Sequence, residues 1–139
     1  MSIGLKRSNS AVGFSIAVAM LISFAALKAP PDARAASEHA VIAVISLKSG
    51  DMGSADERDR IVALERQLSS AIAQSKAGEL DGDEFGGGVC TIYLYGPSAE
   101  RLSEVVLPIL RSFRPPAGSY VIKRYGKPGS KEDRISIAE

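Results

Sequence analysis

Cysteine and histidine are almost absent from this chain of 139 residues, which contains only Cys90 and His39. One cysteine cannot form an internal disulfide, and this one lies too far from the N-terminus to carry the lipid of a lipoprotein. Zinc binding is excluded as well, because no second cysteine or histidine lies at a useful spacing. Cys90 alternates with apolar Ile92 and Leu94, which predicts a buried thiol rather than half of a Cys–His nucleophile.

The first 35 residues have the order of a secretory signal peptide. Lys6 and Arg7 precede an uncharged run over 11–27, and Pro30-Pro31 and Ala33-Arg34-Ala35 follow it. We therefore expect cleavage after Ala35 and a periplasmic or secreted protein. The run has 17 residues, which is long for a signal peptide and near the lower limit for crossing a bilayer. An uncleaved single N-terminal membrane anchor is the alternative.

The remaining residues, 36–139, are enough for one domain and too few for two. They contain 13 basic and 15 acidic residues, so the mature net charge is near −2. This balance argues against a nucleic-acid partner. Residues 50–100 are predominantly acidic and 101–139 predominantly basic. The uneven charge is typical of an ordinary solvated surface, of head-to-tail self-association, or of an anionic partner at the C-terminal end.

Hydrophobic periodicity and turn residues predict the order of helices and strands. Ser54 and Glu57 form a capping-box pattern that begins a helix, and Gly78 supplies its stop. A second helix is expected to bend at Pro108 because proline cannot donate the helical bond. The expected strands are 40–47, 79–85, 89–95 and 120–125, with a weaker strand at 134–138, and the two helices lie between 54 and 78 and between 98 and 114.

This order, βαββαβ with a possible extra C-terminal strand, predicts an α+β ferredoxin-like sandwich. Two amphipathic helices would cover one face of an antiparallel sheet and leave the other face open. The motifs LDGDEFGGG at 80–88, YLYGP at 93–97 and RYG at 124–126 resemble those of a group of small bacterial α/β domains. The resemblance implies a ferredoxin-like fold, and it assigns no activity and no residue role.

Aromatic and basic residues on two of the strands form the main candidate site. Tyr93, Tyr95, Tyr120 and Arg124 would share a face if their strands were neighbours, because side chains alternate along a strand. They would then offer aromatic area, phenolic donors and a guanidinium fork for a carboxylate or phosphate. Ordinary sheet packing explains most of this pattern, because aromatic residues suit strands; a ligand or interface site on the open sheet face is the alternative for which these four residues are the candidates.

Asp81, Asp83 and Glu84 beside three glycines are candidate ligands for a cation such as Ca²⁺. Their spacing does not match an EF-hand loop, and a solvated hairpin is the favoured interpretation. A phosphate loop is disfavoured because a strand follows the glycines and the three carboxylates would repel an anion. We therefore predict no metal and no cofactor.

These features predict an exported binding or interaction domain without catalytic activity, which contacts an unknown protein or small ligand, or a second copy of itself, through the open sheet face. A small cofactor-independent enzyme with a pocket on that face is one alternative. A membrane-tethered subunit of an envelope complex is another. Contact with a membrane is expected only through the N-terminal segment, if it stays uncleaved.

Overall fold

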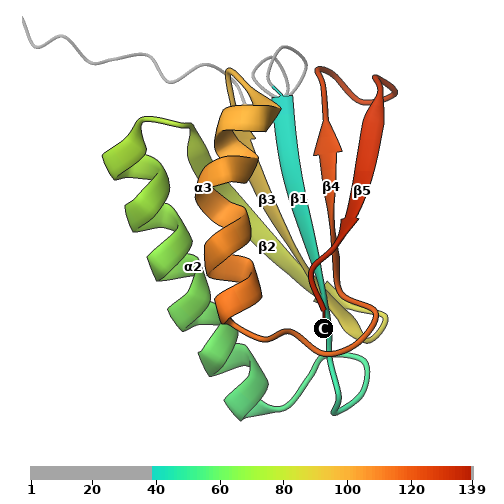
Figure 1. The fold of residues 1–139 in the computed structure, drawn as a ribbon. Helices are drawn as coiled ribbons and strands as arrows, with labels where there is room; N and C mark the ends of the chain where they lie inside the picture. The colour runs from blue at the N-terminus through green and yellow to red at the C-terminus, as the bar shows by residue number, and fades with distance from the viewer. Residues whose placement is uncertain (1–38, 139) are drawn as a thin grey trace, which may run out of the picture.

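A five-stranded antiparallel sheet carries two helices on one of its faces in the computed structural model, which describes residues 39–138 (Figure 1). The elements in chain order are β1 (His39–Ser46), α2 (Ala55–Ser75), β2 (Glu79–Gly86), β3 (Val89–Gly96), α3 (Ala99–Ser112), β4 (Tyr120–Arg124) and β5 (Glu132–Ser136). The protein is therefore α+β, as expected. Its order of elements fits a ferredoxin-like arrangement.

The strands lie in the order β2-β3-β1-β4-β5, and every neighbouring pair is antiparallel. The central strand, β1, is apolar on both faces. Val41, Ala43 and Ile45 are buried beneath the helices, whereas Ile42 and Val44 lie on the opposite face and are half-buried.

The helices α2 and α3 lie side by side over the sheet (Figure 1). Each presents an apolar stripe at spacings of three and four residues, which fits the helical period. The core between the two layers consists of aliphatic side chains and one thiol: Val41, Ala43, Ile45, Ile61, Leu64, Leu68, Ile72, Ala77, Cys90, Ile92, Leu94, Leu102, Val106, Leu110, Val121 and Ile137.

Helix α2 begins as predicted and ends differently. Ser54 is its N-cap and forms the reciprocal capping box with Glu57. The helix stops at Lys76, which takes the left-handed conformation (φ 53°) that we expected at Gly78. Gly78 is instead the residue just before β2, where the backbone passes very close to β3. A Cβ on Gly78 would lie 2.0 Å from the carbonyl oxygen of Tyr95, so only glycine fits there.

Helix α3 contains Pro108 and ends at Ser112, so the proline lies within the helix as expected. The glycine turn between β2 and β3 is tight, and Gly87 and Gly88 take positive φ values of 60° and 76°, which suits the short turns of hairpins. Strand β5 lies two residues earlier than expected, because its pairing with β4 sets its bounds.

The predicted signal peptide or membrane anchor, 1–35, lies outside the described residues. Within 39–138, neither helix is both long enough and apolar enough to cross a bilayer.

Candidate functional site

The four residues of the predicted site lie on one face of the sheet, the face opposite the helices. Tyr95 and Arg124 both pair with Ala40 of β1, from opposite sides, and Tyr93 pairs with Ile42. Paired residues share a face, so the predicted common face is confirmed. The strands β3 and β4 are not neighbours, however, because β1 lies between them. We call this surface the open sheet face.

The middle of the open sheet face is apolar. Ile42, Val44 and Ile122 lie there on β1 and β4, and all three are half-buried. Tyr93 and Tyr95 border them on β3, and Tyr120 borders them on β4. No helix or strand within 39–138 covers this surface. The open sheet face therefore combines an aliphatic centre with aromatic side chains on both sides.

Arg124 is the most deeply buried charged residue of the face, with 8% of its surface exposed. Its Nε donates a 3.0 Å hydrogen bond to the carbonyl oxygen of Gly126. One donor of the predicted guanidinium fork is thus already used to hold the start of the β4–β5 loop.

Charged side chains lie at both edges of the open sheet face: Glu79 and Glu84 on β2, and Glu132 and Arg134 on β5. The hydroxyl of Tyr93 donates to Oε2 of Glu84 on β2 at 3.3 Å. Partial burial raises the pKa of Tyr93, and the carboxylate of Glu84 raises it further. On the other side, the guanidinium carbon of Arg134 on β5 lies 3.4 Å from the centre of the Tyr120 ring, in cation–π contact.

Sequence reasoning missed the role of Arg134 and assigned Glu84 to a different site. Alternation along β5 would place Arg134 on one of two faces, but the register against β4 is needed to say which. The structure pairs Arg134 with Ile122, and this pairing puts it on the open sheet face.

The predicted cation ligands do not converge. Asp81 lies at a bulge between Leu80 and Gly82, where the register shifts. Asp83 pairs with Ile92 and faces the helices, whereas Glu84 pairs with Thr91 and lies on the open sheet face. Among residues 39–138, no three Asp, Glu, His or Cys side chains are grouped to hold a metal ion.

Asp83 instead lies near a carboxyl group of helix α2. Oε1 of Glu65 is buried without a hydrogen-bond partner. Burial raises the pKa of Glu65, and the neighbouring charge of Asp83 adds to the effect. Burial also raises the pKa of the Cys90 thiol to about 12. Cys90 is therefore an unreactive core residue. His39 is far from it, since His39 pairs with Gly96 and Cys90 pairs with Ile45.

A second polar cluster ties β4 and β5 to the start of α3. The hydroxyl of Tyr125 donates a 2.8 Å hydrogen bond to Asp133, and Lys123 forms an ion pair with Glu100 at 3.6 Å. The carboxylates of Asp133 and Glu100 raise the pKa of Tyr125. The ammonium groups of Lys123 and Lys131 lie 5.5 and 5.0 Å from the centre of its ring. These polar and charged groups pair with one another, as is typical of a contact that stabilises the fold.

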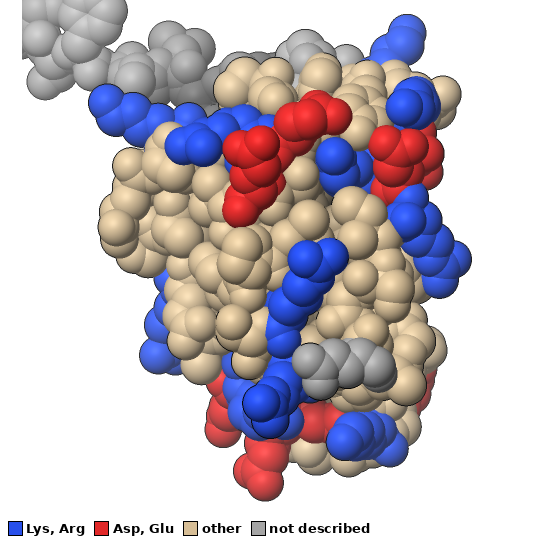
Figure 2. Space-filling model, viewed as in Figure 1, with Lys and Arg blue, Asp and Glu red and all other residues tan. Residues whose placement is uncertain are grey.

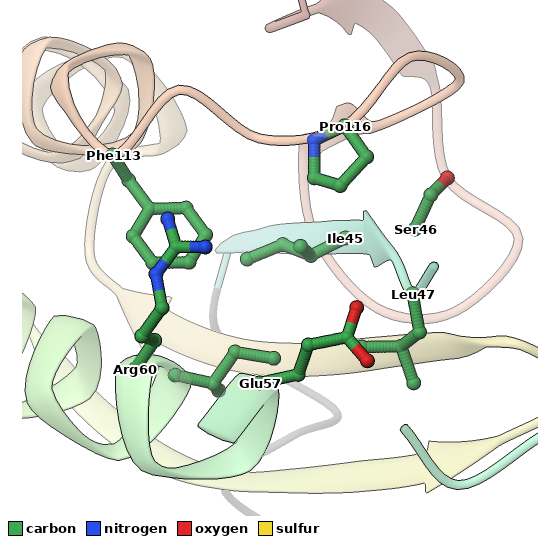
Figure 3. Close-up of a pocket in the computed structure, with 8 residues that line it drawn as sticks. Ile45, Ser46, Leu47, Glu57, Arg60, Phe113 and Pro116 are labelled. Carbon is green, nitrogen blue, oxygen red and sulfur yellow. The ribbon is translucent and has the colours of Figure 1, made fainter. Parts of the chain in front are cut away.

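Two hollows lie near the helices. One, at the end of β1, is bordered by Ile45, Glu57, Arg60 and Phe113 among others (Figure 3). Its volume of about 20 Å³ is enough for a single water molecule. The other is a groove of about 340 Å³ between α2 and α3, which no carboxylate, histidine or cysteine lines.

Arg60 and Phe113 line both hollows, and the guanidinium carbon of Arg60 lies 4.9 Å from the centre of the Phe113 ring. On the side of the molecule seen in Figure 2, basic and acidic side chains are interspersed rather than separated by sign. That distribution is typical of a solvated surface.

Comparison with known proteins adds no assignment: no protein-family model, no curated protein and no solved structure matches this chain.

Proposed function

We propose that this protein is an exported binding domain of ferredoxin-like fold, without catalytic activity, whose open sheet face contacts a partner. Export rests on the order of charged, apolar and small residues in 1–35. The ferredoxin-like fold is supported by the order βαββαβ and by the position of β1 between β3 and β4.

The observation that carries the proposal is the apolar centre of the open sheet face. Ile42, Val44 and Ile122 adjoin one another across two paired strands and keep part of their surface in contact with solvent. Isolated apolar side chains on a surface need no explanation, but a contiguous apolar patch is typical of an interaction site. Each 100 Å² of apolar surface removed from water is worth about 2.5 kcal/mol, so a partner gains binding energy in proportion to the apolar surface that it covers here.

The geometry of the open sheet face favours binding over catalysis. An enzyme site is usually concave and contains an acid, a base or a nucleophile that converges on the substrate. Neither of the two hollows borders the candidate side chains of this face. The polar groups of the face contact one another, as the Tyr93–Glu84 hydrogen bond and the Arg134–Tyr120 stack illustrate.

Site-specific photocrosslinking in the living producing cell tests the proposal. A benzophenone amino acid in place of Thr91 projects from the open sheet face, beside Val44. The matched control carries the same amino acid at Arg66, which is exposed on α2. We expect a crosslinked adduct of defined mass from position 91 and none from position 66.

The mass of the adduct identifies the kind of partner. Absence of an adduct at position 91, or equal adducts at both positions, would contradict a binding role for the open sheet face. Circular dichroism of both variants checks that each retains its fold.

A further inference from the structure

Two carboxyl groups meet at the side of the core, one on α2 and one on β2. Asp83 pairs with Ile92, which is buried beneath the helices, so Asp83 faces the helices as well. Leu80 and Phe85, on the same side of β2, pack against the core. Glu65 on α2 lies within hydrogen-bonding reach of Asp83. We call Glu65 and Asp83 the carboxyl pair, and it lies where α2 packs over β2.

One oxygen of the carboxyl pair is buried and has no donor. Among residues 39–138, nothing forms a hydrogen bond with Oε1 of Glu65. An ionised carboxyl group only accepts hydrogen bonds, so two carboxylates cannot satisfy each other. A protonated carboxyl group is also a donor. One proton on Glu65 would therefore turn the contact with Asp83 from a repulsion into a hydrogen bond.

The surroundings of Glu65 supply no cation that could take the place of this proton. The titratable groups that act on one another here are Glu65, Asp83 from β2 and Cys90 from β3. Helix α3 also packs against α2, and no charged group of α3 acts on Glu65. Burial raises the pKa of Glu65, and the charge of Asp83 raises it further. The site thus favours a protonated Glu65.

We propose that the carboxyl pair is a pH-sensitive contact between α2 and β2, which is closed while Glu65 carries a proton and donates it to the Asp83 carboxylate. The contact opens when this proton passes to water. It is fully formed in mild acid and weakens as the pH rises through the titration of Glu65. This is the opposite of the behaviour of a carboxylate that is stabilised by a cation.

The carboxyl pair lies where the fold can open locally. β2 is an edge strand that pairs only with β3, and α2 packs over its inner side. Parts of a protein with fewer neighbours open at a lower free energy than its centre does. Loss of the proton leaves two adjacent negative charges, which repel each other, and a buried oxygen that needs water. Both effects favour separation of β2 from α2.

Carbon-13 NMR of the side-chain carboxyl groups tests the proton directly on the full-length gene product. The titration midpoint of Glu65 should lie above its ordinary value of 4.5. Asp83→Asn removes the neighbouring charge and supplies an amide donor, so the midpoint of Glu65 should fall. Asp59→Asn removes a charge at an exposed position of α2 and should leave the midpoint unchanged. An equal midpoint in Asp83→Asn and the wild type would overturn the proposal.

Amide hydrogen exchange, corrected for the intrinsic effect of pH, tests the opening. In the wild type, the opening constant of the hydrogen-bonded amides of β2 should rise with pH, by up to about tenfold per unit, which is the limit for one proton. Glu65→Gln should lose this dependence, because its amide can donate to Asp83 at any pH. Asp59→Asn should keep it.

Two results of the exchange experiment would also overturn the proposal. One is the same pH dependence in Glu65→Gln and in the wild type. The other is equal protection of β2 and β4 above the titration midpoint of Glu65, because β2 would then open only when the whole domain unfolds. Circular dichroism of each variant checks that it is folded over the pH range that is measured.

Discussion

Ser54 and Glu57 bond to each other in both directions at the start of α2. Oγ of Ser54 accepts a hydrogen bond from the backbone N–H of Glu57 at 3.2 Å, and Oε2 of Glu57 accepts one from the backbone N–H of Ser54 at 3.0 Å. Oε1 of Glu57 also accepts from the backbone N–H of Lys48 at 2.6 Å. These bonds to the carboxylate lower the pKa of Glu57 to about 2. One carboxylate thus joins the helix start to the loop after β1.

Protonation of the Glu57 carboxylate should lower the free energy of unfolding in acid. The folded pKa is about 2 and the ordinary value is 4.5, so the contribution is present above about pH 4.5 and is lost as the pH falls toward 2. We expect Glu57→Gln to be less stable than the wild type at pH 7 and to approach it at pH 2, as measured by urea unfolding followed by circular dichroism. Asp59→Asn controls for the loss of one negative charge. A difference between wild type and Glu57→Gln that stays constant with pH would contradict the role of the carboxylate.

Removal of the cap hydroxyl should also weaken the fold. Ser54→Ala deletes the acceptor for the Glu57 N–H, and loss of an N-cap of this kind costs about 1 kcal/mol. The midpoint of urea unfolding should decrease, with an unchanged slope. A Ser54→Asp variant keeps an acceptor at the cap and should retain most of the lost stability. Equal stability of Ser54→Ala and the wild type would argue against the observed cap.

Gly78 should tolerate no side chain, although it lies near the surface. A Cβ there would lie 2.0 Å from the backbone oxygen of Tyr95, and the glycine has φ 155°. We expect Gly78→Ala to destabilise the protein by about 1–3 kcal/mol, as overpacking does. At Gly82, within β2, a Cβ would meet nothing within 4 Å. Gly82→Ala is the matched control, and thermal unfolding of the two variants should differ clearly; similar melting temperatures would contradict the close approach.

Glu65→Gln should stabilise the protein at neutral pH. Burial and the charge of Asp83 raise the pKa of Glu65, so the folded state binds its proton more tightly than the unfolded state does. The free energy of unfolding therefore falls as the pH rises through the interval between the two pKa values. A neutral amide removes this loss and can donate a hydrogen bond to Asp83. The melting temperature at pH 7 should increase, and a decrease would contradict the interpretation.

The N-terminus of the native protein should begin at Ala36. The order of basic, apolar and small residues before it predicts cleavage after Ala35. Intact-mass spectrometry of the protein recovered from its producing cells measures this directly. A start at Met1 or Ser2 would favour the membrane anchor instead.

The secondary structure was largely readable from local residues. The capping box of Ser54 and Glu57 begins α2, and the glycines at 86–88 lie at the turn that joins β2 to β3. Alternation along β3 correctly separated buried Ile92 and Leu94 from half-buried Tyr93 and Tyr95. The predicted end of α2 was less accurate, because a lysine adopts the left-handed conformation where glycine is the usual choice.

The sequence by itself determined the order of the elements and the class of the fold, because caps, turns and periodicity act between residues close in the chain. The tertiary structure decided that β1 separates Tyr93 from Tyr120, and that Glu84 and Arg134 lie on the same face. Strand pairing joins residues that are distant in the chain, and a register shift of one residue would turn each of these side chains to the other face. Local patterns leave that register open, and only the packed sheet sets it.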